Sequence, residues 1–158
     1  MATLEHLRGD GTLVRYDAEL EPGEMPQRMI YMAVAFVDWA EDVLFSELAD
    51  EDQPLSPYEQ VEARFYDFVV NRPMVYGVHK KLLRPEIRGV WTLRTDDVRV
   101  FGWFPAKGIF VAVRGEMKRN LQKIADYDAH IGRVREYRDT LPLDEPKSIA
   151  GTRPDEIA

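Results

Sequence analysis

Three consecutive strand-like segments limit the possible fold more than any other feature of the sequence. They cover residues 90–94, 98–104 and 109–114, and apolar residues alternate through each of them with other side chains. The links between them, 95–97 and 105–108, are short and contain Asp, Pro and Gly, which is typical of hairpin turns. The run therefore predicts an antiparallel meander of three strands.

An apolar run rich in β-branched and aromatic residues precedes the meander, at 28–36, and predicts a buried strand. Apolar residues at helical spacing over 37–50 predict that a helix follows, with Asp38 and Glu41 as its N-terminal capping box. The apolar run and this spacing together predict a strand followed directly by a helix.

Ser56 gives the clearest local signal of a helix start. Its side chain can cap the helix, Pro57 suits the first helical position, and the Glu59 side chain can bond back to the Ser56 backbone. The Arg-Pro pair at 72–73 would end this second helix. A last helix is predicted near 120–140, where apolar residues form one stripe. The predicted order is β-α-α-β-β-β-α, an α+β fold with a helical hairpin packed on one face of an antiparallel sheet and a C-terminal helix.

The sequence divides into three parts. Residues 1–27 are predicted to be an N-terminal extension with a short strand, and 28–140 form the domain. Residues 141–158 are predicted to be a polar tail, because they contain no core-forming pattern.

Composition excludes several classes of protein. The chain has 158 residues, of which 45% are hydrophobic and 31% charged, as expected for one soluble globular domain. Without cysteine it can have neither disulfides nor thiol chemistry. No apolar run approaches the ~20 residues of a membrane span, and no secretory signal opens the chain, so we expect a cytoplasmic protein that does not bind membranes. The scattered histidines His6, His79 and His130 and the absence of glycine-rich phosphate loops predict neither a metal nor a cofactor.

Charge is distributed unevenly along the chain. Residues 1–71 contain 4 Lys and Arg against 16 Asp and Glu, whereas residues 72–123 contain 12 against 4. The net charge of −7 therefore hides an acidic half and a basic segment. The basic segment can bind nucleic acid locally, or the two blocks can neutralise each other within the fold.

The arginines of the meander form the most informative pattern. With Phe104 facing Ile109 across a four-residue turn, Arg99 would face Arg114. A four-residue first turn would also place Arg94 opposite Arg99. Like charges opposite one another destabilise a sheet unless carboxylates or a bound anion lie between them. Both explanations stay open at this point.

The segment 79–119 resembles the RelE/ParE superfamily of toxins, particularly its phage-derived RelE-like branch. The matching elements are a Lys-Leu pair at 81–82, the motif Gly-Val-Trp-Thr-Leu-Arg at 89–94, Arg99, the apolar strand 109–113 and the basic pair at 118–119. The resemblance covers about a quarter of the chain. It implies a RelE-like fold.

The resemblance further implies a metal-independent endoribonuclease, ribosome-dependent or RNA-directed, whose partners are an antitoxin and RNA or the ribosome. By this resemblance Arg99 and Arg119 are the candidate catalytic residues. The candidate residues for binding RNA or phosphate are Arg94, Arg114, Lys118, Lys80 and Lys81. Arginine suits this task because its planar fork matches phosphate oxygens.

A second function stays open. Active relatives often carry lysines where this chain has Val90 and Thr92, and the expected catalytic Tyr or His has only Tyr127 and His130 as candidates, both within the predicted helix. The fold alone does not fix the activity. The alternative is a non-catalytic RelE-fold module of phage origin that binds another protein through its acidic N-terminal region and its tail.

Overall fold

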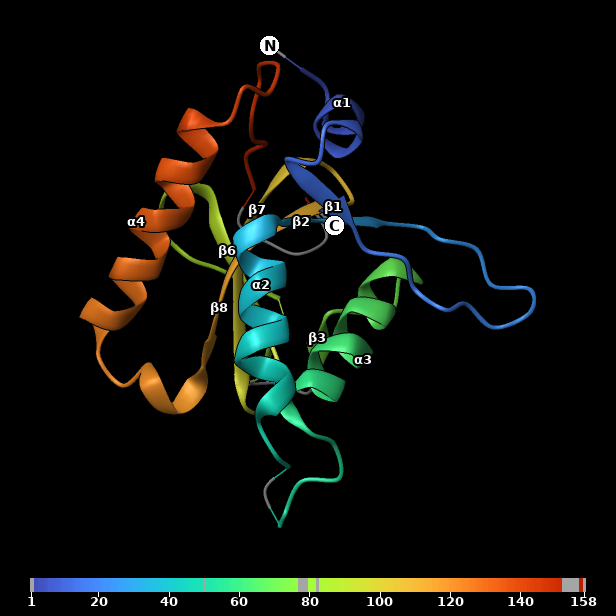
Figure 1. Cartoon of the computed structure of the whole chain (residues 1–158), viewed down its shortest axis with the longest axis vertical. Helices are drawn as coiled ribbons and strands as arrows, with labels where there is room; N and C mark the ends of the chain where they lie inside the picture. Colours follow the sequence, from blue (N-terminus) through green and yellow to red (C-terminus); the bar gives the residue numbers. More distant parts are fainter. Residues whose placement is uncertain (1, 50, 77–79, 82, 152–156, 158) are drawn as a thin grey trace.

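A mixed sheet of six strands lies between two layers of helix in the computed structural model (Figure 1). The structure describes residues 2–49, 51–76, 80–81, 83–151 and 157, and only the backbone of 75–76, 80–81 and 88. Across the sheet the strands follow the order β1 (Leu13–Arg15), β2 (Met29–Ala33), β8 (Ile109–Met117), β7 (Val98–Ala106), β6 (Val90–Arg94) and β5 (Leu83–Pro85). The α+β class and the three-strand meander are confirmed.

The helices and the remaining short elements surround this sheet. They are α1 (Leu4–Gly9), α2 (Val34–Asp42), α3 (Pro57–Val69) and α4 (Ile124–Thr140), with the 3₁₀ turns η1 (Leu44–Ser46), η2 (Ile87–Gly89) and η3 (Lys118–Asn120) and the strand pair β3 (Val75–Tyr76) and β4 (Lys80–Lys81). None of the described helices is long and apolar enough to cross a membrane.

The sequence analysis predicted a purely antiparallel sheet, but the observed sheet is mixed. β2 pairs with β8 in parallel, with Ile30 opposite Phe110, whereas every other pair in the sheet is antiparallel. The prediction was wrong because alternation within a strand carries no information on the direction of its neighbour.

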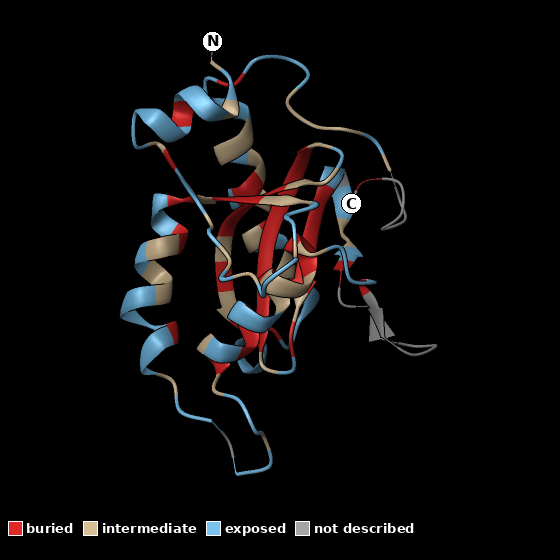
Figure 2. Ribbon diagram, turned by 90° about the vertical axis from the view of Figure 1, so that its right-hand side faces the viewer, coloured by how far each residue is buried: buried red, intermediate tan, exposed pale blue. Residues whose placement is uncertain are grey.

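Each face of the sheet has its own core, as expected from the alternation of side chains along a strand. On one face, Phe36 of α2 and Phe65 of α3 belong to the cluster that includes Phe104 and Phe110. On the other, Val134 of α4 belongs to the cluster built on residues such as Phe101 and Trp103. Burying a side chain of this size contributes about 1.5–3 kcal/mol. The predicted helical hairpin therefore covers one face, α4 covers the other, and the buried residues concentrate on the strands between them (Figure 2).

The start of α3 is confirmed, and the start of α2 is not. The Ser56 hydroxyl accepts a bond of 3.3 Å from the Glu59 amide, and the Glu59 carboxylate accepts one of 3.1 Å from the Ser56 amide. β2 ends at Ala33, which is the N-cap of α2 without any side-chain cap, so the predicted strand 28–36 was too long and the predicted capping box at 38–41 was wrong. An apolar run without turn residues is compatible with both strand and helix. The last helix begins at Ile124, slightly later than predicted.

The register of the second hairpin differs from the prediction. Ala106 faces Ile109 across the two-residue turn Lys107-Gly108, in which Gly108 has a φ of 76° that glycine adopts at little cost. Consequently Arg99 faces Glu116 and not Arg114. The predicted pair of Arg94 and Arg99 across the first hairpin is confirmed.

A β-bulge explains where Arg114 points. Phe101 faces Arg114 and Gly102 faces Ala112, so Val113 is an extra residue in β8. The bulge interrupts the alternation and turns Arg114 to the face that α4 covers. Without this extra residue Arg114 would point into the core beneath α2.

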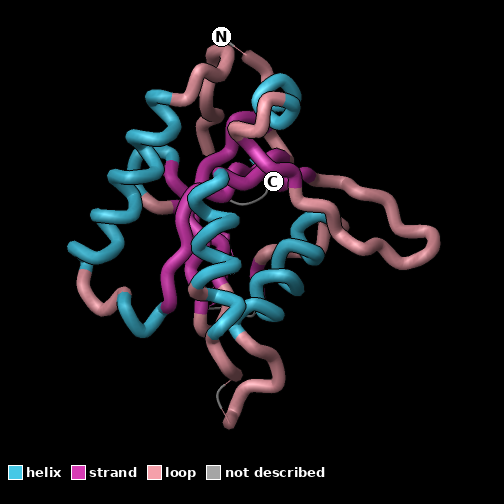
Figure 3. The backbone as a smooth tube through the Cα atoms, viewed as in Figure 1, coloured by secondary structure: helices cyan, strands magenta, loops and turns pink. Residues whose placement is uncertain are grey.

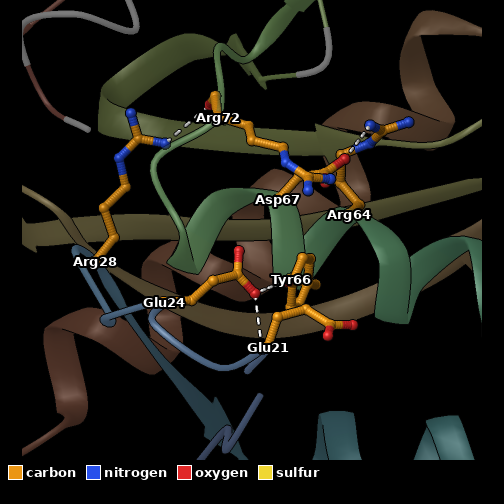
Figure 4. Close-up of polar contacts among 7 residues, drawn as sticks. All are labelled: Glu21, Glu24, Arg28, Arg64, Tyr66, Asp67 and Arg72. Atoms are coloured by element: carbon orange, nitrogen blue, oxygen red, sulfur yellow. Dashed lines mark hydrogen bonds and ion pairs between the residues drawn. The ribbon is translucent and has the colours of Figure 1, made fainter. Parts of the chain in front are cut away.

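Both ends of the chain belong to the folded body. The predicted strand in 1–27 is confirmed as β1, which pairs with β2. Between them, the long loop visible in Figure 3 is fixed to α3 by Tyr66, whose hydroxyl donates to Glu24 (Figure 4). Arg28, at the end of this loop, lies 5.0 Å over the centre of the Phe68 ring. The expectation of a tail without core residues was wrong, because Leu141, Leu143 and Ile157 are buried.

The backbone of this C-terminal segment bonds to the meander. The Ile149 amide donates to the Phe104 carbonyl at 3.0 Å, and the Gly108 amide donates to the Ile157 carbonyl at 2.7 Å. Apolar residues spaced this far apart form neither a helical stripe nor a strand pattern, so periodicity did not detect them.

We predict that Gly102→Ala strongly destabilises the protein. The added Cβ would lie 2.0 Å from the Val111 carbonyl oxygen and 2.6 Å from the Phe110 ring, and the backbone oxygen cannot move aside without breaking the bulge. Overpacking of this kind costs about 1–3 kcal/mol of unfolding free energy, measured by urea denaturation. In the control, Gly132→Ala, the Cβ meets nothing within 4 Å and should stabilise α4 by up to about 1 kcal/mol. Equal effects of the two substitutions would contradict the prediction.

Candidate functional site

The face of β6, β7 and β8 that α4 covers carries an arginine cluster, which we define as Arg94, Arg99, Arg114, Tyr127 and His130. The register places Arg94 beside Arg99, and the bulge brings Arg114 to the same face. Tyr127 and His130 lie one turn apart in α4, and both contact the ring of Phe101 between the arginines. Three strands and one helix therefore place these side chains together.

Arg99 is the most enclosed member of the cluster, with only 7% of its surface exposed. Its Nη1 atom donates to the carbonyl oxygens of Thr95 at 2.6 Å and Val98 at 3.0 Å. Its Nε is buried and has no hydrogen-bond partner within the described part of the chain. The Nη1 atom of this guanidinium thus holds the turn between β6 and β7.

Arg94 is bound by a carboxylate and an aromatic ring. Its Nη2 lies 3.3 Å from the Glu86 carboxylate, and its guanidinium carbon lies 5.9 Å from the centre of the Tyr127 ring. Burial, followed by repulsion from Arg99, lowers the pKa of Arg94. The side chain is thus desolvated and held by Glu86 and Tyr127.

Arg114, His130 and Glu116 form a chain of polar contacts. The Arg114 Nε donates to the Nδ1 atom of His130 at 3.1 Å, so the proton of a neutral imidazole lies on Nε2, which is 3.6 Å from the Glu116 carboxylate. Burial lowers the pKa of His130, and the charge of Arg114 lowers it further. The His130 ring also stacks on Phe101, with 5.0 Å between centroids.

The cluster combines three guanidinium groups with nearby carboxylates. Glu86 pairs with Arg94, Glu116 faces Arg99 and approaches His130, and Asp126 also acts on the pKa of His130. The carboxylates support the explanation in which the arginines are neutralised within the fold. A neutral histidine with a proton on Nε2 is capable of acid–base chemistry, but its basic nitrogen accepts a bond from Arg114.

The two candidate catalytic arginines are not brought together. Arg119, on η3, pairs with the Glu47 carboxylate through contacts of 2.5 and 3.2 Å. Glu47 follows η1, whose Leu44 belongs to the core on the α2 and α3 side of the sheet, whereas Arg99 lies on the side of α4.

The remaining predicted residues are Lys118, Lys80 and Lys81. Lys118 is exposed, and its backbone amide donates to the Asp97 carbonyl. The side chains of Lys80 and Lys81 lie outside the described part of the structure, where only the backbone of β4 is defined.

Tyr127 and His130 belong to the site, although the sequence analysis named them only as candidates for an expected catalytic Tyr or His, and Glu116 is a neighbour of the site. The positions of Tyr127 and His130, three apart in a predicted helix, place both side chains on one face, and this spacing was the available signal. The predicted register put Arg114 opposite Arg99, where the structure has Glu116.

Neither metal ligation nor similarity to known proteins identifies the site. Within the described residues, no three or more Asp, Glu or His side chains are grouped to hold a metal ion. Comparisons with protein-family models, curated proteins and solved structures find no match to this chain.

We predict that His130 makes stability depend on pH. Its pKa in the folded protein is below the ordinary 6.5, so the unfolded chain takes up the proton first on acidification. The contribution of neutral His130 is therefore complete above the unfolded pKa and is lost as the pH falls toward the folded pKa. In urea unfolding across this window, His130→Gln should flatten the dependence of the unfolding free energy on pH. An unchanged slope in His130→Gln would contradict the prediction.

Proposed function

We propose that this chain is a RelE-like module that acts by binding a protein partner and not by cleaving RNA. The observation that carries the proposal is that Arg99 and Arg119 are each bonded within the chain to different partners, Arg99 to the Thr95 and Val98 carbonyls and Arg119 to the Glu47 carboxylate. Phosphoryl-transfer chemistry requires its charged groups to converge on one reacting phosphate. The resemblance of 79–119 to the RelE/ParE superfamily and the helical hairpin beside the meander support the fold assignment.

The acidic N-terminal half offers a surface for such a partner. Phe45 and Leu48 are 68% and 85% exposed, beside the half-buried Tyr58, whose ring lies 5.0 Å from that of Phe45. We call these three residues, with Val43, the apolar patch. They lie in or beside the connection between α2 and α3, which extends past the end of the sheet at the bottom of Figure 1. Large apolar side chains exposed together are typical of interaction sites.

Charge indicates what kind of segment the apolar patch accepts. Residues 29–63 contain nine Asp and Glu and no Lys, Arg or His. Glu41 and Glu62 lie close enough to Tyr58 to raise its pKa, after burial as the main cause. An acidic surround with an apolar centre is complementary to a basic amphipathic segment, which we propose as the occupant.

A second candidate function is the RNA-cleaving toxin, neutralised by an antitoxin. The convergence of Arg94, Arg99 and Arg114 with Tyr127 and His130 on one face favours it, because guanidinium groups beside an acid–base pair suit metal-independent phosphate chemistry. It requires α4 to uncover Arg99, which is 7% exposed.

Expression in bacteria separates the two functions. We expect wild type and the Arg99→Ala, Arg119→Ala double variant to allow equal growth, with intact mRNA on primer-extension analysis. Growth arrest and mRNA cleavage by the wild type alone, with both proteins folded by circular dichroism, would establish the toxin and refute the binding module.

Binding of a synthetic helical peptide tests the proposed surface. A fluorescent peptide of Leu and Lys at amphipathic spacing should bind the wild type in anisotropy measurements, whereas its Leu and Glu counterpart should not. The Phe45→Ser, Leu48→Ser variant should weaken binding at least about tenfold, because it removes two large apolar contacts. Met25→Ser is the matched control, since Met25 is 68% exposed in the loop between β1 and β2 and is not part of the apolar patch. Equal binding by the patch variant and the control would sink the assignment of this surface.

A further inference from the structure

We propose that the groove between α4 and the first turn of α2 binds the phosphate group of a small phosphate ester. The groove has a volume of about 510 Å³ and is lined by Ala33 and Ala35 at the start of α2, Val113 and Arg114 in β8, and a stripe of α4. Its volume falls within the usual range for small-molecule sites, about 300–1,000 Å³. This inference goes beyond the proposed function and does not depend on it.

Two arginines enter this groove from different elements. Arg114 reaches it from β8 because of the bulge, and Arg133 reaches it from α4. Both residues line the groove, and the pKa of Arg114 is lowered by burial and further by the charge of Arg133. Among the described residues no carboxylate forms an ion pair with Arg133. Two adjacent guanidinium groups repel each other unless an anion lies between them.

The start of α2 adds a third source of positive potential. This helix has nine residues, no side-chain cap at Ala33 and no acidic residue in its first turn. The first amides of an α-helix lack intrahelical acceptors and carry the positive end of the helix dipole. Ala33 and Ala35 line the groove, so the uncapped turn and the arginines face the same space. A phosphate group can accept hydrogen bonds from both guanidinium groups and from the helix amides at the same time.

The rest of the lining indicates the body of the ligand. Ala33 and Val113 provide an apolar floor, and Tyr137 contributes an aromatic wall whose hydroxyl is buried without a partner among the described residues. Such walls suit a small apolar or aromatic group attached to the phosphate. Glu136 also lines the groove, and its negative charge repels an anion, so replacing it with a neutral residue should strengthen phosphate binding.

Titration calorimetry at neutral pH and low ionic strength tests the site, with phenyl phosphate as the probe. The wild type should bind phenyl phosphate, bind benzoate more weakly and not bind phenol. Arg133→Gln should weaken phenyl phosphate binding about tenfold or more, as expected for losing a hydrogen bond to a charged group. Glu136→Gln should strengthen it severalfold, and Ala35→Asp should abolish it by placing a carboxylate at the helix start.

Arg84→Gln is the matched control, because it removes the same charge from an exposed position on β5, outside the groove. It should bind phenyl phosphate like the wild type. The proposal fails if the wild type does not bind this probe, or if Arg133→Gln and Arg84→Gln affect binding equally. Tighter binding of a uridine dinucleotide than of phenyl phosphate would assign the groove to a polynucleotide backbone and also overturn it. Since Arg133 is exposed, the Arg133→Gln variant should remain folded. The comparison of Arg133→Gln with Arg84→Gln therefore still tests the proposal if Ala35→Asp unfolds the protein.

Discussion

The parallel pairing of β2 with β8 is the interaction on which the rest of the structure depends. It joins the acidic N-terminal half of the chain to the basic meander, from Met29 opposite Ile109 to Met32 opposite Ala112. Parallel strands cannot be linked by a tight turn, so the chain between them must cross a face of the sheet. α2 and α3 make that crossing and fill one face, and the other face is left for α4.

The sequence predicted the elements whose signals are local. The capping box at Ser56 and the meander were found because turn residues and alternation act over a few positions. The start of α2, the parallel pairing and the burial of Leu141, Leu143 and Ile157 could not be found, since they depend on contacts with segments far away in the chain. Tertiary packing overrides local preference in such places.

The length of the second turn and one extra residue in β8 together decide what differs between the predicted and the observed site. The sequence identified the arginines, but their neighbours follow from the register, and neither the two-residue turn at 107–108 nor the bulge at Val113 has a signal that periodicity detects. In place of the predicted row of three arginines, the register puts Arg99 opposite Glu116, and the bulge turns Arg114 to the face where it meets His130. The same shift takes Arg114 to the edge of the groove beside α2.

Short strands at both borders of the sheet constrain how this protein can associate. β1 and β5 have three residues each, and β5 ends in Pro85, which has no amide hydrogen to donate. Such borders offer little backbone for a further strand to pair with, which protects a sheet from joining another sheet edge to edge. Among the described residues, these borders therefore favour contacts through side chains of the helical layers over contacts through strand exchange.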